Sequence, residues 1–435
     1  MATKGNALLD LAFAMDCTGS MDPYIDEARE NIVNIVDEVV KTENCTVRLA
    51  LVEYRDHPPE DETFITQKHD FTNSVETMKS WLEECEADGG GDTPEAIADA
   101  LNDVLHLSWR EEATKICVFI ADAPLHGLAT DDDEDSFPEG CPDGLDPMNI
   151  SKDLAGKGVA LYVVGCEPSV SDYKDFYLAL AEITGGQYVP LTDANNLTKV
   201  IIFGSKEEMS LKKLEAEVEE EIKVLTSSGI VINEEELSSS LHKKWSDRGE
   251  KTKQLMLNHK VLETAKNSAN ASAMAKMGFE GVRNLFATSL REAKRDSGKC
   301  LDTSKSDGGG DKDLQEEMSK ADKVAKATRA LADLKIGQKS VDKSFKKVNP
   351  GELSQTIDFG PAESCQKSIS KSWIKVDLGE LPQTVDSGPA EKEALSTEEG
   401  SEYQCIDEGV TMSQTMRIIQ KSMMKMSRSG KDDKK

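Results

Sequence analysis

The chain has 435 residues, of which 81 are acidic and 52 basic, so its formal net charge at pH 7 is −29. Residues 1–209 hold 43 of the acidic and 14 of the basic side chains, which leaves the remaining residues balanced. This length predicts two or three units, and an acidic first half excludes nucleic acid as an expected partner and disfavours anionic membranes.

Short apolar strands alternate with helical patterns in the first half of the chain. Strands are expected at residues 8–16, 46–54, 63–70, 114–122, 159–165 and 187–190, and helices near residues 23–41, 73–86, 94–107, 147–156, 172–184 and 195–203. This alternation predicts an α/β fold with a doubly wound, mainly parallel sheet. Ligands of such sheets bind beyond the carboxyl ends of the strands, where the strand order switches.

The first expected strand leads directly into the pentapeptide Asp16-Cys17-Thr18-Gly19-Ser20. Alternate residues of an extended chain point the same way, so the side chains of Asp16, Thr18 and Ser20 can converge. One carboxylate and two hydroxyls suit a hard ion such as Mg²⁺. Taken alone, the pattern also fits an ordinary turn or a helix N-cap.

Two later segments add a hydroxyl and a second carboxylate. The glycine-rich stretch 89–95 opens a helix with Pro94 in its first turn, which leaves Thr93 in a loop. Residues 114–122 form a continuous apolar strand that ends in Asp122, and such runs are typical of strands covered on both faces. The two strand-terminal aspartates are therefore expected where the fold places ligands.

Five residues in this order resemble the metal-ion-dependent adhesion site of von Willebrand factor type A domains: Asp16, Thr18, Ser20, Thr93 and Asp122. The resemblance covers about residues 7–215, and Thr18 replaces the commoner serine. Residues 120–127 and 181–188 closely resemble the A domains that are joined to alpha-type kinases in protists and fungi. The second half has neither a phosphate-binding Gly-rich loop on a strand pair nor a Cys/His zinc cluster, so we expect no kinase domain in this chain.

The resemblance implies a bound Mg²⁺, with Ca²⁺ or Mn²⁺ as alternatives. The three hydroxyl side chains would contact the ion directly, and the two aspartates would act largely through bound waters. An ion with mostly neutral ligands stays electron-poor, so the implied partner is a protein that offers an Asp or Glu carboxylate. Water activation is the rival use of such an ion. Only His126 could supply a base, and a lone loop histidine is more often solvated, so we predict no enzyme.

Two charged loops accompany the predicted site. The stretch 129–147 contains the acidic run 131–135, which is either a solvated charge run or a second cation site, because Asp clusters in flexible loops suit Ca²⁺. The loop 55–62 also resembles the kinase-linked A domains, but its residues indicate no specific task.

Nine cysteines without a Cys-x-x-Cys pair argue against a zinc site and against a disulfide framework. Cys17 should face away from Asp16 by alternation. The apolar run 7–15 follows a single lysine, carries Asp10 and serves as the first strand, so we expect no secretory signal. No stretch is long and apolar enough to span a bilayer. These features predict a cytoplasmic protein.

The composition predicts three regions: an A domain at 1–210, a helical segment at 211–295 and a largely disordered tail at 296–435. Within the helical segment, apolar residues at three- and four-residue steps predict an amphipathic helix near 211–225. A second helical block at 233–295 is expected to pack as a hairpin or coiled coil. Its alternative use is helix-mediated association with a partner.

The tail is rich in Gly, Ser, Lys and Asp, which is typical of disorder. Residues 351–363 and 379–391 repeat each other, either as a duplication without consequence or as a tandem motif that gains avidity. A short helix near 313–334 and a weakly amphipathic basic helix at 416–435 are also expected. Membrane contact by the latter would be weak.

Three functional classes follow from the sequence. We favour a metal-dependent protein-binding module. The alternatives are an accessory or regulatory relative of alpha-type kinases and a scaffold with a vestigial metal site. Metal dependence separates the first class from the third, and phosphate transfer from ATP would identify a kinase.

Overall fold

The computed structural model describes residues 7–128, 135–302 and 402–432. Six strands form its central sheet in the order β3-β2-β1-β4-β5-β6. All neighbouring strands are parallel except β2 and β3, which confirms the doubly wound, mainly parallel sheet. The strands are β1 Ala7–Asp16, β2 Cys45–Tyr54, β3 Thr66–Thr72, β4 Thr114–Ala121, β5 Val159–Cys166 and β6 Gln187–Leu191.

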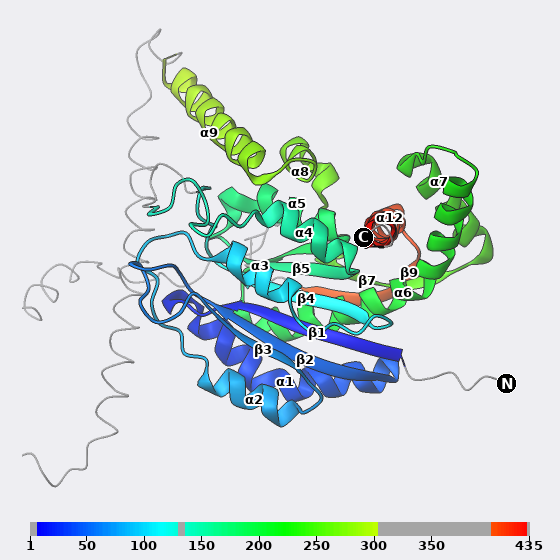
Figure 1. The fold of residues 1–435 in the computed structure, drawn as a ribbon, viewed down its shortest axis with the longest axis horizontal. Coiled ribbons are helices and arrows are strands. Elements are labelled where there is room, and N and C mark those ends of the chain that lie inside the picture. Colours follow the sequence, from blue (N-terminus) through cyan, green and yellow to red (C-terminus); the bar gives the residue numbers. More distant parts are fainter. Residues whose placement is uncertain (1–6, 129–134, 303–401, 433–435) are drawn as a thin grey trace, which may run out of the picture. The chain divides into compact units, whose positions relative to one another are not determined.

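Helices cover both faces of the sheet (Figure 1). One face packs against α1 (Asp22–Glu43), α2 (Val75–Glu84) and the first half of α6 (Leu197–Ser227). The other packs against α3 (Ile97–Leu105), α4 (Pro147–Gly156) and α5 (Lys174–Thr184). Short 3₁₀ turns complete this part: η1 Gly19–Met21, η2 Ser171–Tyr173 and η3 Ala194–Asn196.

Strand β1 shows how the sequence assigns these two faces. Leu11 and Phe13 pack in the core beneath α1, whereas Ala12 and Ala14 pack in the core beneath α3 and α5. Every residue from 9 to 16 is buried, because parallel strands with helices on both faces have no solvent side. The continuous apolar run in the sequence follows from this double cover.

The strand order reverses between β1 and β4. The chain leaves β1 to form β2 on one side and later returns to form β4 on the other side. The carboxyl ends of these two adjacent strands therefore open a crevice at the edge of the sheet. Asp16 ends β1 and Asp122 follows β4.

Residues 233–295 depart from the expected helical block. Helix α7 (Glu234–Arg248) ends at Gly249, which has a φ of +67°, and a hairpin of β7 (Lys251–Leu257) and β8 (Lys260–Val261) follows. Its turn, Asn258-His259, has positive φ at both residues, as a type I′ hairpin requires. The prediction of helix at 251–261 was therefore wrong. The elements that follow are η4 Ala265–Asn267, α8 Ala269–Met274 and α9 Phe279–Asp302.

The last described residues return to the folded unit. Strand β9 (Tyr403–Gly409) pairs with β7 and gives a second sheet in the order β8-β7-β9. Helix α12 (Met412–Asp432) packs against α6 and α7, which lie beside it in Figure 1. The helix expected at 416–435 is present as α12, whereas the expectation of disorder fails for β9, which the sequence did not predict. A β-strand that finds its partner about 150 residues away leaves no local signal.

Several expectations fall on residues that the structure does not describe. These are the acidic run up to residue 134, the short helix at 313–334, and the repeated segments 351–363 and 379–391. Among the described helices, none is long and apolar enough to cross a membrane. The cytoplasmic location stays a prediction.

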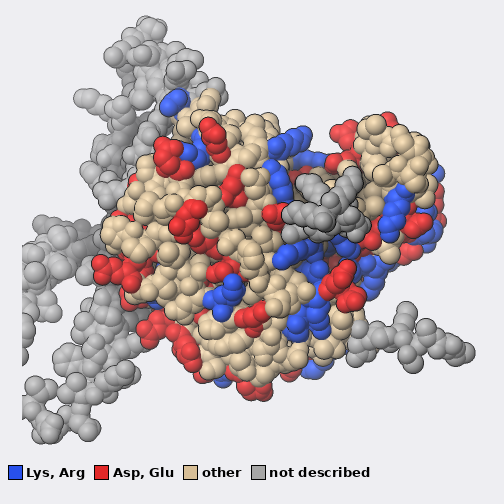
Figure 2. Space-filling view, in the orientation of Figure 1, with Lys and Arg blue, Asp and Glu red and all other residues tan. Residues whose placement is uncertain are grey.

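A buried ion cluster joins α12 to α6. Arg417 contacts Glu207 at 3.1 Å and Glu208 at 3.0 Å, and its Nε donates to the carbonyl of Gly185 at 2.9 Å. Lys421 pairs with the same Glu208. All four charged side chains are buried, so each depends on its partners for the stabilisation that water would otherwise give. Other Lys and Arg side chains gather on the surface around α12 (Figure 2).

This cluster predicts that Arg417→Met destabilises the protein by about 3–5 kcal/mol, because it keeps most of the side-chain volume but leaves Glu207 and Glu208 buried without their cation. The control is Lys425→Met, which removes a partly exposed pair with Glu219 and should cost about 0–1 kcal/mol. Urea denaturation of the full chain measures both. Equal costs for the two variants would contradict the role assigned to the cluster.

Candidate metal centre

Asp16 is fully buried at the end of β1. The backbone N–H and the hydroxyl of Thr18 both donate to its Oδ1, at 2.9 and 2.7 Å. The other oxygen, Oδ2, is buried and has no hydrogen-bond partner among the described residues. Thr18 therefore fixes the carboxylate in one orientation and leaves one oxygen available for a ligand.

Asp122 lies beside this group, directly after β4. Burial raises the pKa of Asp122, and a hydrogen bond with Ser20 opposes the shift. Its Oδ1 is buried without a partner in the described part of the chain. Burial, followed by repulsion from Asp122, raises the pKa of Asp16 to about 8. Two neighbouring carboxylates thus resist ionisation in the absence of a cation.

Glu95 is a member of this group that the sequence analysis missed. Its backbone N–H donates to the carbonyl of Pro124 at 2.9 Å, which holds the start of the α3 segment against the residues after β4. Burial raises the pKa of Glu95 to about 11, and nearby aspartates, Asp16 and Asp56 first, add to the shift. Its Oε2 also lacks a partner within the described ranges.

Thr93 lies exposed in the same glycine-rich loop. Asp16 accepts a hydrogen bond from Thr18 and lies close to Asp122, which hydrogen-bonds with Ser20. Among the described residues, no such contact joins Thr93 to this group.

The loop nevertheless packs closely on the site. A Cβ at Gly90, whose φ is +85°, would lie 3.3 Å from the Oε1 of Glu95 and 3.4 Å from the Cβ of Thr18. Glycine at this position therefore allows the loop to approach both residues. Position 93 follows within the same turn.

His126 is not the solvated loop histidine that the sequence suggests. It is buried, and its ring nitrogens contact Asp56 at 2.6 Å and Asp135 at 3.0 Å. Burial disfavours the charged ring, but hydrogen bonds with these aspartates outweigh it and raise the pKa of His126 to about 9. A protonated imidazole with both nitrogens engaged is a poor general base. Asp92 lies close to the same cluster.

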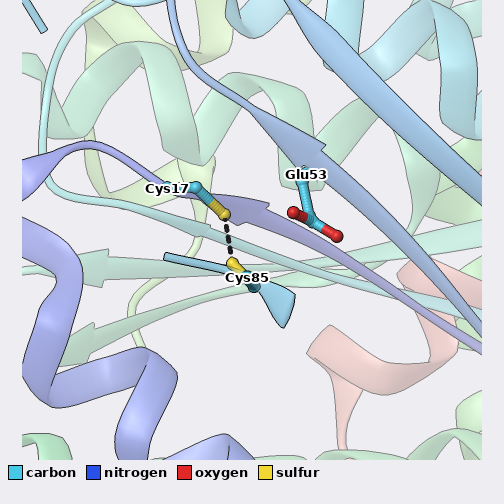
Figure 3. Close-up of side chains that lie close together, drawn as sticks. All are labelled: Cys17, Glu53 and Cys85. Carbon is cyan, nitrogen blue, oxygen red and sulfur yellow. Dashed lines mark hydrogen bonds between the residues drawn. The ribbon is translucent and has the colours of Figure 1, made fainter. Parts of the chain in front are cut away.

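Behind Asp16, the next side chain points into the core. Cys17 and Cys85 contact each other at 2.8 Å, with Glu53 nearby (Figure 3). The Nε of Arg55 donates to the carbonyl of Cys17 at 3.1 Å. The alternation expected at positions 16 and 17 is present, since one side chain faces the crevice and the other the core beneath α1.

The donor set fits a divalent cation of the hard class. Three carboxylates, those of the buried Asp16 and Glu95 and the half-buried Asp122, each keep a buried oxygen without a partner in the described structure, and hydroxyls lie beside them. Buried polar atoms are rarely left unpaired in folded proteins. Oxygen ligands of this kind suit Mg²⁺, Ca²⁺ or Mn²⁺.

Comparisons with known proteins find a family model and relatives that match part of this chain. Residues 10–130 match the family model of the von Willebrand factor A domain. The alpha-protein kinase vwkA of Dictyostelium discoideum is 29% identical over 162 residues, which cover 37% of this chain and 26% of the kinase. An ariadne-like RING finger protein of Acanthamoeba polyphaga mimivirus is 27% identical over 195 residues, which cover 43% and 19% of the two chains.

Solved structures with similar folds include proximal thread matrix protein 1 of the mussel byssus, 17% identical with a TM-score of 0.34, with 47% of each chain covered. A von Willebrand factor type A protein from Catenulispora acidiphila is 15% identical with a TM-score of 0.33, and the match covers 47% of this chain and 43% of that one. This chain spans about a quarter of the length of the kinase and a fifth of that of the viral protein. The resemblance inferred from five residues is confirmed for part of the chain: residues 10–130 are similar to the von Willebrand factor A domain.

Proposed function

We propose that this chain is a divalent-metal-dependent protein-binding module. The fold itself supports a protein-interaction role. The metal dependence rests on one observation, the buried carboxylate oxygens without partners in the described structure at the carboxyl ends of β1 and β4. The residues proposed to hold Mg²⁺, or alternatively Ca²⁺ or Mn²⁺, are Asp16, Thr18, Ser20, Thr93 and Asp122.

The bound ion would supply a positively charged coordination position for a carboxylate oxygen of a partner protein. Side chains of this chain would orient the ion and the incoming carboxylate. Thr18 holds the Asp16 carboxylate in place through two hydrogen bonds. Thr93 is exposed and lies where a partner can reach it. We add Glu95 to the set, since its carboxylate increases the attraction for a cation.

The excess of acidic side chains around the site limits which partner surfaces can approach. Without a cation, the raised pKa values of Asp16, Asp122 and Glu95 favour their protonated forms, and the site offers an incoming carboxylate no positive charge. With a cation, these groups can ionise around it while the ion attracts the carboxylate of the partner. Binding of an acidic partner should therefore depend on the ion more strongly than it would at a neutral site.

Two other functions remain as alternatives. The similarity to vwkA supports an accessory or regulatory role beside alpha-type kinases. A scaffold with a vestigial metal site is the other. We assign no catalytic residue, because the nearest histidine, His126, is ion-paired on both ring nitrogens.

The first test is thermal unfolding of the full chain with chelator and then with Mg²⁺, Ca²⁺ or Mn²⁺. Ligand that binds only the native state at 100 times its Kd stabilises it by about 2.7 kcal/mol, so the midpoint should rise. Asp16→Ala should remove this rise, and Asp37→Ala, which changes an exposed aspartate of α1, should keep it. A wild-type midpoint that no ion changes would contradict the metal site.

The second test addresses the partner. A library of peptides with one Asp or Glu, and a matched library with Asn or Gln, is captured on the full chain with and without Mg²⁺. We expect acidic peptides to bind only with metal, Asp16→Ala to abolish this binding and Thr93→Ala to weaken it. If metal stabilises the chain but acidic peptides bind no better than their amide counterparts, the chain binds metal and the proposed capture of a carboxylate is wrong.

The raised pKa of Asp16 predicts a specific pH dependence. Its folded pKa of about 8 lies above the ordinary value of 3.8. Stability from the protonated group is therefore fully present below about pH 4 and is lost as pH rises towards 8. The metal-free protein should lose stability across this range, and stabilisation by Mg²⁺ should increase, because ionised carboxylates bind cations. Denaturation at several pH values, with and without Mg²⁺, measures both trends.

Glu95→Gln should separate the two roles of this side chain. It replaces a buried carboxyl of raised pKa by a neutral group of nearly the same shape, so the metal-free protein should be as stable as wild type or more stable at pH 8. The affinity for Mg²⁺ should fall. Glu111→Gln, an exposed position, is the control, and an unchanged metal affinity in Glu95→Gln would exclude Glu95 from the site.

A further inference from the structure

A second group of potential metal ligands lies in the loops beside the carboxylate cluster. The Nε2 of His57 is 3.0 Å from the Oδ2 of Asp99. The Sγ of Cys141 is 3.3 Å from the same carboxylate oxygen and 3.9 Å from the same ring nitrogen. A ring nitrogen, a carboxylate oxygen and a sulfur atom therefore lie close enough together to contact one ion.

These side chains come from three separate parts of the fold. His57 follows β2, Asp99 lies in the first turn of α3, and Cys141 precedes α4. His57 and Cys141 are 84 residues apart in the chain. Because no short spacing connects the three, the absence of a Cys-x-x-Cys pair could not exclude such a site.

The backbone around this group is held in place. The N–H groups of Glu60 and Asp61 both donate to the carbonyl of His57. The N–H of Gly144 donates to the carbonyl of Cys141 at 2.9 Å. The ring of Phe137 meets the imidazole of His57 edge-on at 5.6 Å and shields one side of it. His57 itself is only 3% exposed.

We propose that His57, Asp99 and Cys141 bind a zinc ion. Zinc takes thiolate, imidazole and carboxylate ligands at about 2.0–2.3 Å, so tetrahedral ligands lie roughly 3.3–3.6 Å from one another. The observed separations of 3.0, 3.3 and 3.9 Å bracket this range. Mg²⁺ and Ca²⁺ select oxygen ligands, so the thiol and the imidazole favour zinc over the ion proposed for the first site.

The cluster of Cys17, Cys85 and Glu53 is a weaker candidate. Its two sulfur atoms are 2.8 Å apart. Two thiolates on one tetrahedral zinc lie roughly 3.8 Å apart, so this cluster would have to open within a closely packed core. The His57 group needs no such movement.

Zinc at this position would join two loops that border the carboxylate cluster. Asp56, next to His57, pairs with His126. The loop that carries Cys141 also carries Asp135, which pairs with the other nitrogen of the same histidine. The three protein ligands leave a fourth position for water. The second ion would thus fix the position of the loops around the first site, without contacting it.

The test uses the full chain, stripped of metal by a chelator and dialysed. After addition of Zn²⁺ and removal of the excess, we expect about one tightly held zinc per chain, measured by atomic spectrometry. Co²⁺ added instead should give a thiolate-to-cobalt charge-transfer band in the near ultraviolet and the visible bands of tetrahedral cobalt. A wild-type chain that retains no zinc and shows no such band overturns the proposal.

Variants decide which residues hold the ion. Cys141→Ser and His57→Gln should each weaken zinc binding by more than the roughly 10–100-fold that loss of an outer-shell partner costs, and Cys141→Ser should remove the charge-transfer band. Cys405→Ser changes a thiol of β9 and should keep both signals. Unchanged zinc content or an unchanged band in Cys141→Ser overturns the assignment. Near-ultraviolet circular dichroism checks that each variant is folded.

Asp16→Ala separates this site from the proposed adhesion site. It should keep the zinc and the cobalt band while it loses stabilisation by Mg²⁺. Loss of the cobalt band in folded Asp16→Ala would mean that the thiolate site is not independent, and this outcome would overturn the proposal as well. Failure of the Mg²⁺ response alone would affect only the proposed function.

Discussion

The main constraint on this structure is the group of carboxylates that lie close together where β1 and β4 end. A doubly wound sheet places these two strand ends side by side. Asp16, Asp122 and Glu95 meet there with oxygens that have no partner in the described structure. Such a group opposes folding when it is ionised and without a cation. The free energy needed to hold these carboxylates together must therefore come from packing elsewhere. Two apolar cores, one on each face of the sheet, provide this packing.

Residues 402–432 add contacts to this packing. Helix α12 inserts Arg417 and Lys421 among buried glutamates of α6, and β9 completes the second sheet with β7. Here the buried glutamates are paired with cationic side chains, whereas the carboxyl groups at the strand ends form no ion pair with any described residue. Paired charges are typical of a structural contact, whereas charged groups without a partner are typical of a site that binds a ligand. The protein thus uses buried acids in two different ways.

The sequence was sufficient for most of the central sheet, because its buried strands carry apolar runs, which the polar strand β3 lacks. Asp16 and Asp122 could be placed for the same reason, since each follows a strand. Glu95 was not predicted as a site residue, because it is buried by residues that follow β4, and no local sequence pattern indicates that contact. Strand β7 was not predicted, because its main partner, β9, lies about 150 residues away in the sequence. Contacts between distant segments were the part that sequence patterns could not supply.

The same reasoning explains why the loops around the site matter for function. Loops normally carry little stability of their own, yet here His126 holds two of them through Asp56 and Asp135. A charged imidazole between two carboxylates removes one negative charge from the cluster without occupying the crevice. His57 and Cys141 extend the same connection to α3 through Asp99. The acidic side chains around the crevice are therefore held in a defined position, as the proposed recognition through a bound cation would require.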